Sequence, residues 1–338
     1  MAHISIVTPA GAGTRNGNRH TALRWASLLR RAGHSVSVAV EWRGETCDML
    51  IALHARRSHG SIVQFKKKFV EKKLVVVLTG TDLYRDLPGS AEARESLELA
   101  DRLIVLQGEA LRELDARLRR KARVVYQSAD PKLRHAPPQG RFRVVVIGHL
   151  RAEKDPLRAI LALMRLPYKE MQLIHLGEAL EKSLGQKAKK LMLLEPRYRW
   201  LGGVPHRRAL GWLARSHLLV VSSVMEGGAN VIAEAARIGT PVIASRVSGN
   251  VGMLGRNYPG FFPLFDDRAL SDLLKRAYVN ADYYEKLKKS LQERKALFSP
   301  SAERAALIAA IALPFRAPAR SSSRSRRRPR SGSGRRGR

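Results

Sequence analysis

The sequence predicts an α/β fold built from two doubly wound parallel sheets, one in each half of the chain. Short apolar segments alternate with amphipathic segments through most of the chain, as strands alternate with helices in βαβ units. The predicted strands carry few polar residues, which is typical of parallel sheets that helices cover on both faces. The alternation stops between residues 130 and 140, where prolines and Gly140 indicate a linker.

Four regions follow from this pattern. We expect an N-terminal domain over residues 1–136, a C-terminal domain over 141–298, a helical segment over 299–315 and a disordered Arg/Ser-rich tail over 316–338. The tail is almost without apolar residues, so it cannot bury enough surface to offset the entropy cost of ordering. We expect at most weak, non-specific binding of polyanions by this tail.

Composition excludes some classes of protein. A chain of 338 residues with 44% hydrophobic residues and one cysteine, Cys47, is expected to form two cores without disulfides. We see neither a signal peptide nor an apolar run long enough to span a membrane, so we expect a cytoplasmic protein without membrane insertion. The net charge of +33 is compatible with an enzyme that binds anionic substrates. It is also compatible with a different class of protein, a basic nucleic-acid-binding protein, which we keep as an alternative.

The first half contains six predicted strands. They cover residues 4–8, 35–40, 49–53, 74–78, 102–106 and 123–126, with helices over 20–32, 91–100 and 109–119. The loop after the first strand is rich in glycine, but Asn16 stands where a dinucleotide-binding fingerprint needs its third glycine. We interpret this loop as a flexible lip that brings Arg15 and Arg19 beside a phosphate; an ordinary solvated loop is the alternative.

Polar residues follow two strands of the first half. His54 comes directly after the strand 49–53, and Thr79-Gly-Thr-Asp82 follows the strand 74–78. Ligands collect at the carboxyl ends of strands in open parallel sheets, so both segments are candidates for a binding site. His54 is equally compatible with a hydrogen-bonded loop residue.

The second half repeats the architecture. Its strands are predicted over 142–147, 172–176, 218–221 and 241–244, with helices ending at 164 and covering 180–194, 207–214, 229–237, 268–278 and 282–297. The turn between the strand 218–221 and the helix 229–237 contains Gly227 and Gly228, with Glu226 before it and Glu234 on the helix. Free amides at a helix start favour an anion such as a diphosphate. The two glutamates are better suited to accept hydrogen bonds from sugar hydroxyls.

This turn resembles a known family. The pattern Ser-x-x-Glu-Gly-Gly-x-Asn-x-x-x-Glu, followed by Gly-Thr-Pro-Val-Ile-Ala, is similar to the E-x7-E region of nucleotide-sugar glycosyltransferases with two facing Rossmann-like domains, the GT-B fold. The resemblance implies that Glu234 holds the nucleotide ribose and that Glu226 contacts the donor sugar. It also implies a set of donor-binding residues: Gly17, Arg151, Lys154, Val204, Gly227, Gly228, Ala229, Asn230 and Glu234. Two exposed charges on an amphipathic helix are the alternative interpretation of the glutamates.

Other segments resemble the selenosugar synthases of selenoneine biosynthesis. They are Asn16-Gly-Asn-Arg-His-Thr-Ala-Leu-Arg-Trp25, Ala52-Leu-His-Ala-Arg-Arg-Ser58, Leu78-Thr-Gly-Thr-Asp-Leu-Tyr84 and Gly148-His-Leu-Arg-x-x-Lys-Asp-Pro156. This resemblance implies a UDP-sugar donor, UDP-glucose or UDP-N-acetylglucosamine, and selenophosphate as the nucleophile, giving a 1-seleno-sugar. A glycosyltransferase of this fold that acts on a hydroxyl acceptor is the alternative.

One loop departs from ordinary relatives. They carry Gly-Arg-Leu-x-x-x-Lys-Gly, whereas here His149 stands at the Arg position, Asp155 stands at the last Gly position and Lys154 is kept. Arg151 lies in the same loop and its guanidinium is suited to phosphate oxygens. We therefore expect Lys154 and Arg151 to bind the donor diphosphate. We see no acid-x-acid motif and expect neither a cofactor nor an essential metal.

The nucleophile is expected to bind to the first half. Selenophosphate is already an anion, so attack needs no general base, and the site must mainly hold two phosphate-bearing substrates together. We assign catalytic roles to His54 and Glu226. The predicted nucleophile-binding residues are Asn18, Arg19, Arg56, Arg57, Thr79, Gly80, Thr81, Asp82 and His149.

Overall fold

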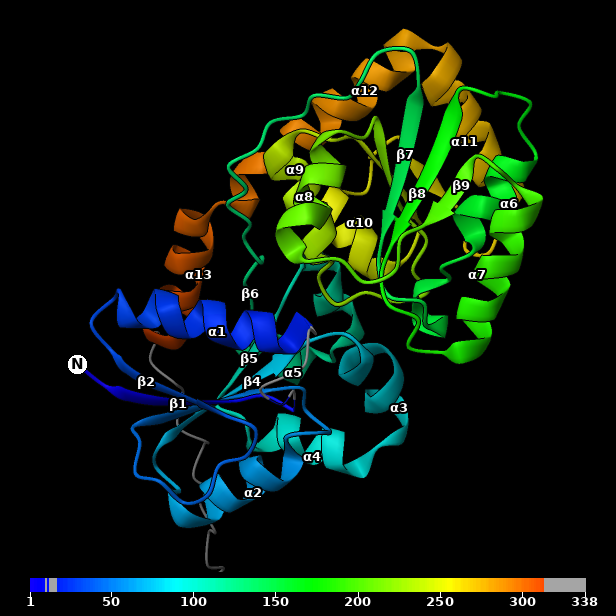
Figure 1. The fold of residues 1–338 in the computed structure, drawn as a ribbon. Helices are drawn as coiled ribbons and strands as arrows, with labels where there is room; N and C mark the ends of the chain where they lie inside the picture. Colours follow the sequence, from blue (N-terminus) through cyan, green and yellow to red (C-terminus); the bar gives the residue numbers. More distant parts are fainter. Residues whose placement is uncertain (10, 12–16, 313–338) are drawn as a thin grey trace, which may run out of the picture.

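The computed structural model contains two six-stranded sheets that lie one above the other, each flanked by helices (Figure 1). It describes residues 1–9, 11 and 17–312. The predicted tail over 316–338 and the part of the glycine-rich lip that holds Arg15 lie outside these residues. All strand pairs in both sheets are parallel. The predicted fold class is confirmed.

The first sheet has the strand order β2-β1-β3-β4-β5-β6. Its strands are β1 (His3–Val7), β2 (Ser35–Ala39), β3 (Met49–Leu53), β4 (Lys73–Leu78), β5 (Arg102–Val105) and β6 (Ala122–Val124). Its α-helices are α1 (Gly17–Arg30), α2 (His59–Lys68), α3 (Leu87–Gly89), α4 (Ala91–Leu99) and α5 (Ala116–Lys121). The order reverses between β1 and β3, so the loops after these two strands diverge to opposite faces of the sheet and leave a crevice for a ligand.

The second sheet has the strand order β12-β11-β10-β7-β8-β9. Its strands are β7 (Phe142–Ile147), β8 (Met171–Leu176), β9 (Tyr198–Trp200), β10 (Leu218–Val221), β11 (Val242–Ser245) and β12 (Phe261–Phe262). Its α-helices are α6 (Arg158–Met164), α7 (Lys182–Leu194), α8 (His206–Ala214), α9 (Asn230–Ile238), α10 (Ser248–Leu254), α11 (Asp267–Val279) and α12 (Ala281–Gln292). Counted along the chain from β7, this is the order of dinucleotide-binding domains, and its reversal lies between β7 and β10.

Two predicted helices differ from the structure. The segment predicted as one helix over 109–119 is a 3-10 helix, Gly108–Glu113, followed by α5. The 3-10 helix does not continue into α5, because Asp115 caps a new helix: its side chain accepts a hydrogen bond from the amide of Leu118 (2.8 Å). The helix predicted over 282–297 ends at Gln292, and a short 3-10 turn, Lys295–Phe298, follows it.

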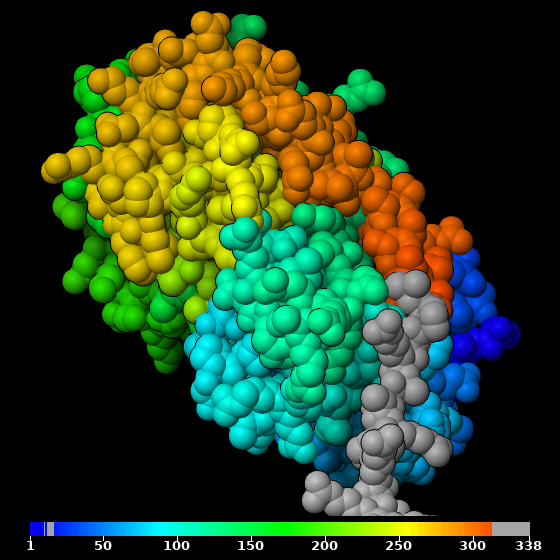
Figure 2. Space-filling view, turned by 180° about the vertical axis from the view of Figure 1, so that it is seen from behind, coloured from blue at the N-terminus to red at the C-terminus, as the bar shows by residue number. Residues whose placement is uncertain are grey.

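The last helix of the described chain, α13 (Pro300–Ala312), returns to the first domain. It packs against α1 on the side of the molecule away from α3 (Figure 1), and the space-filling view shows this segment running from the upper domain onto the lower one (Figure 2). Leu307 and Ile311 are buried in the core that contains Trp25 and Leu29. The C-terminal part of the described chain therefore stabilises the N-terminal domain. Among the described residues, every helix is too short or too polar to span a membrane.

Candidate functional site

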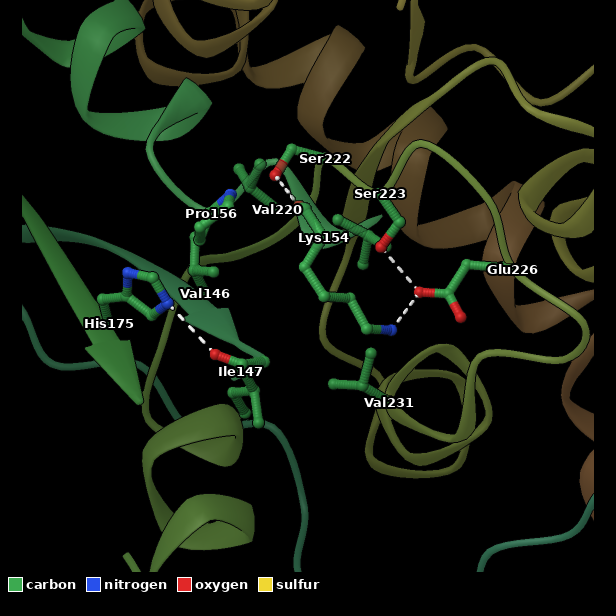
Figure 3. Close-up of a pocket in the computed structure, with 12 residues that line it drawn as sticks. Val146, Ile147, Lys154, Pro156, His175, Val220, Ser222, Ser223, Glu226 and Val231 are labelled. Atoms are coloured by element: carbon green, nitrogen blue, oxygen red, sulfur yellow. Dashed lines mark hydrogen bonds and ion pairs between the residues drawn. The ribbon is translucent and has the colours of Figure 1, made fainter. Parts of the chain in front are cut away.

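The loops after β7 and β10 meet at the point where the strand order of the second sheet reverses. Lys154 lies in the first loop and Glu226 in the second, and Lys154 Nζ forms a short ion pair with Glu226 Oε1 (Figure 3). Ser223 Oγ donates a hydrogen bond to the same oxygen (2.6 Å). Two residues that the sequence predicts for one site are thus brought into direct contact by adjacent strands.

A small cavity of about 20 Å³ lies beside this ion pair. Gly148, His175, Ser222 and Val231 are among its lining residues. His175 is buried, which lowers its pKa to about 4, and its Nε2 is 3.2 Å from the carbonyl oxygen of Gly148. The imidazole is therefore neutral, and Lys154 supplies the positive charge at this end of the site.

Two further predicted residues lie in the loop after β7. His149 Nδ1 accepts a hydrogen bond from the amide of Glu178 (3.1 Å), which fixes the ring against the neighbouring loop. Arg151 Nε is buried and hydrogen-bonds no residue in the described part of the chain. His149 and Arg151 thus lie in the same loop as Lys154. Their contacts with the substrates remain predictions.

Glu234 lines a different and larger pocket of about 260 Å³. This pocket lies between α1 of the first domain and α8 and α9 of the second; its lining includes His20, Arg24, Ser128, His206, Asn230 and Glu234. Glu234 Oε1 is 2.8 Å from Nε2 of His206, and this hydrogen bond raises the pKa of His206. Glu226 and Glu234 therefore line separate hollows on either side of the start of α9.

The turn with Gly227 and Gly228 touches the first domain. A Cβ atom on Gly227 would overlap the carbonyl oxygen of Thr79, and one on Gly228 would lie 2.8 Å from Leu106 Cβ. Gly80, with a φ of +138°, approaches Gly227 from the other side of this contact. Close packing between the domains thus requires glycine at these positions, in addition to the predicted role of the turn in anion binding.

His54 has an unusual backbone and a buried side chain. Its φ of +75° is rare for a residue with a Cβ, and its side chain is only 2% exposed. Nδ1 accepts a hydrogen bond from the amide of Arg57 (3.3 Å), so Nε2 carries the proton toward Thr81 Oγ1 (3.1 Å). Burial lowers the pKa of His54, which keeps the ring neutral. Both ring nitrogens of His54 therefore form hydrogen bonds within the protein.

Asp82 holds the loop after β4 in place. Its fully buried carboxylate accepts hydrogen bonds from the amides of Thr79 (2.9 Å), Gly80 (2.8 Å) and Ala55 (3.0 Å). The side chain therefore joins the two loops that follow β3 and β4. Arg56, the residue after Ala55, forms an ion pair with Asp86 (3.2 Å).

The start of α1 completes the first-domain side of the site. The helix begins at Gly17, which faces Asn230 on α9. Asn18 and Arg19 follow in its first turn, while Val204 lies in the other domain just before α8. The predicted donor-binding residues at Gly17 and at Asn230 are thus neighbours across the domain boundary.

Sequence reasoning missed several polar residues at this boundary. Gln107 follows β5 and donates a hydrogen bond to Tyr84 Oη (2.8 Å), and Tyr84 Oη is 3.2 Å from Ser248 Oγ of the second domain. Gln127 follows β6 and is buried beside Gly228. Both glutamines come after strand ends, so the rule that singled out His54 would have found them. Among the described residues, no group of three or more His, Cys, Asp or Glu side chains could hold a metal ion.

Two parallel-sheet domains that meet at the carboxyl ends of their strands define a protein of the GT-B class. Sucrose-phosphate synthase from Thermosynechococcus elongatus has a similar structure, with a TM-score of 0.74 and 18% identity over 91% of this chain and 97% of its own. HepE from Anabaena, solved in complex with UDP-glucose, has a TM-score of 0.73 and 16% identity over 92% of this chain and 100% of its own. These likenesses support the fold.

The sequence of the second domain points to a family. Residues 131–294 match the model for glycosyl transferases group 1, and this range contains Lys154, Glu226 and Glu234. Just under half of the chain is therefore similar to group 1 glycosyltransferases. No curated protein matches the chain in sequence.

Proposed function

We propose that this protein is a glycosyltransferase that transfers a sugar from a UDP-sugar, UDP-glucose or UDP-N-acetylglucosamine, to selenophosphate. The binding of a nucleotide-sugar donor is supported by the contact between Lys154 and Glu226. This contact lies where the strand order of the second sheet reverses, beside the start of α9. This is where open α/β sheets bind nucleotides. The complexes of HepE with UDP and with UDP-glucose support a UDP-sugar for a protein of this fold.

Lys154 and Glu226 exchange partners when the donor binds. A diphosphate beside the amides at the start of α9 attracts the ammonium group of Lys154, and Arg151 adds a second cation from the same loop. Glu226 then loses its partner and its carboxylate becomes available to the hydroxyl groups of the sugar. Glu234 accepts hydrogen bonds from the ribose hydroxyl groups after its hydrogen bond with His206 breaks.

The first domain supplies the nucleophile. The hydroxyl group of Thr81, in the loop that touches Gly227, can donate a hydrogen bond to the nucleophile, and Arg56 and Arg57 add positive charge. The amides of Thr79 and Gly80 are donated to Asp82 and hold this loop in shape. A small dianion requires this combination of donors and cations. His54 acts through Thr81, because its Nε2 proton orients the hydroxyl group of that residue.

In the proposed step, selenium attacks the anomeric carbon of the sugar. A carbon–selenium bond forms, the bond between that carbon and the diphosphate oxygen breaks, and UDP leaves with the electron pair. Lys154 stabilises the charge that develops on the leaving diphosphate. Water then cleaves the selenium–phosphorus bond and gives the 1-seleno-sugar and phosphate. No proton has to be removed from the nucleophile, which agrees with a His54 whose two nitrogens are already hydrogen-bonded.

Mass spectrometry of the products tests this function. The protein is incubated with UDP-glucose or UDP-N-acetylglucosamine, with and without selenophosphate. We expect UDP and a selenosugar only when selenophosphate is present. A sugar transferred to a hydroxyl acceptor, with selenophosphate inert, would establish the alternative acceptor instead.

A further inference from the structure

Arg24 of α1 reaches the pocket that contains Glu234 and Asn230. It comes from the first domain, whereas both of these residues lie on α9 of the second. Its side chain is 24% exposed, and no described residue accepts a hydrogen bond from its Nη1. Glu234 is paired with His206, and Asp130, the other carboxylate in the lining, is paired with Lys132 (2.9 Å). An edge of the guanidinium group is therefore available to a ligand in the pocket.

Glu303 of α13 fixes the orientation of Arg24. Arg24 Nε donates to both carboxylate oxygens, at 3.1 and 2.9 Å. Glu303 is 1% exposed and also accepts hydrogen bonds from Trp25 Nε1 (2.8 Å) and the amide of Ser128 (2.9 Å). A buried carboxylate with this many donors is held rigidly, so it holds its arginine partner rigidly as well.

Gln127 connects Arg24 to the start of α9. The amide orientation that satisfies its neighbours places the oxygen 3.2 Å from Arg24 Nη2 and the nitrogen 3.0 Å from the carbonyl oxygen of Gly228 and 3.2 Å from Asn230 Oδ1. Gln127 is buried. A continuous polar chain thus runs from α13 through α1 to the turn that is expected to bind the donor.

We infer that Arg24 binds the nucleoside diphosphate of the donor from the first domain and that Glu303 is its positioning residue. A guanidinium group only donates hydrogen bonds, so its partners are oxygens of the ribose or the phosphates. This inference rests on the proposed donor. It also assigns a role to α13: this helix lies outside the pocket, but its Glu303 orients an arginine that binds the donor.

Calorimetric titration with UDP tests the inference through a double-mutant cycle. The proteins are wild type, Arg24→Gln, Glu303→Gln and the double variant. We expect Arg24→Gln to weaken UDP binding about tenfold or more, as for a hydrogen bond to a charged group. Glu303→Gln should weaken it less, and it should have no further effect once Arg24 is changed, because it acts through Arg24.

Controls separate this role from general stability. Glu195 forms a comparable ion pair with Arg197 between α7 and β9, at the end of the second sheet that lies away from the pocket, so Glu195→Gln should lower the Tm but leave the UDP Kd unchanged. If Arg24→Gln does not fold, Arg24→Lys keeps the charge opposite Glu303 and loses the fork, and it should still weaken UDP binding.

The outcomes are distinct. Wild-type UDP affinity in folded Arg24→Gln or Arg24→Lys overturns the role of Arg24. Additive effects in the cycle overturn the positioning role of Glu303. A wild-type protein that binds no UDP overturns the proposed function itself.

Discussion

Gly227 lies directly against Thr79, although the two residues belong to different domains. A Cβ atom at Gly227 would overlap the Thr79 carbonyl oxygen, and one at Gly80 would come within 3.0 Å of the Gly227 amide nitrogen. Two backbone segments that approach this closely leave no room for a side chain. The turn that is expected to bind the donor is thereby placed next to the wall that is expected to bind the nucleophile, as a direct transfer between the two requires.

The first prediction concerns this contact. Gly227→Ala should lower activity at least tenfold, because the methyl group separates the two segments and misplaces the substrates. Gly60→Ala on α2 is the matched control, since a Cβ at Gly60 meets no atom within 4 Å. Steady-state kinetics and the Tm are measured for both variants. Full activity in Gly227→Ala would show that the contact does not matter for transfer.

The second prediction concerns Glu234. Glu234→Ala should weaken UDP binding by about 1.5–3 kcal/mol, the range for hydrogen bonds to charged groups, while the fold is retained. His206→Ala is the comparison variant: it removes the partner of Glu234 and should leave UDP binding as strong as in wild type or stronger. Isothermal titration calorimetry gives both affinities. Unchanged UDP affinity in Glu234→Ala argues against a contact with the ribose.

The third prediction is a pH dependence of donor binding. The hydrogen bond to Glu234 raises the pKa of His206, whereas burial and the charges of His206 and Arg24 lower the pKa of His20, which faces it. The ion pair of His206 with Glu234 is therefore complete below the ordinary histidine pKa of about 6.5 and is lost as pH rises through the raised pKa. Since this pair competes with the ribose, UDP binding should strengthen over that rise.

His206→Gln provides the reference for this pH dependence. The glutamine side chain carries no charge at any pH, so the increase in UDP affinity with pH should be smaller in this variant than in wild type. The titration of the UDP phosphates contributes equally to both proteins and therefore cancels in the comparison. The Kd of UDP is measured between about pH 5.5 and 8.5, on both sides of the ordinary histidine pKa. Identical pH profiles for the two proteins would mean that His206 does not compete with the donor.

The fourth prediction separates the two substrates. Arg56→Ala should raise the KM for selenophosphate, because its guanidinium group adds positive charge to the wall formed by the loops after β3 and β4. The Kd of UDP should not change, since the donor is expected to be bound at α9. An unchanged selenophosphate KM in Arg56→Ala and in His54→Ala would move the nucleophile site elsewhere, with His149 as the next candidate.

Some features of the structure follow from local sequence. The strands Met49–Leu53 and Leu218–Val221 were predicted to the residue, because unbroken apolar runs have clear ends. The contact of Lys154 with Glu226 follows from strand order, since each residue comes after a strand and the two strands are neighbours. Gln107 and Gln127 were equally accessible to the rule about strand ends.

Other features depend on residues that are far apart in the chain. Nothing near Gly227 in the sequence indicates Thr79, so the domain contact could not be predicted from the Gly-Gly pair. Glu303 is separated from Arg24 by almost the whole chain, and only the return of α13 to α1 brings them together. The helix predicted over 109–119 failed for a local reason, because an aspartate inside a helical pattern can also cap a new helix.

In the proposed mechanism, Lys154 is the cation that binds the donor diphosphate and stabilises it as it leaves. The most direct measurement is kcat/KM for the UDP-sugar at saturating selenophosphate, in wild type and in Lys154→Ala. The loss of a charge that stabilises the leaving group should lower kcat/KM roughly a hundredfold or more, as for the removal of one such group from other active sites. The variant should remain folded, because Lys154 is partly exposed. Wild-type kcat/KM in folded Lys154→Ala would contradict the account and make the loop after β7 an ordinary surface turn.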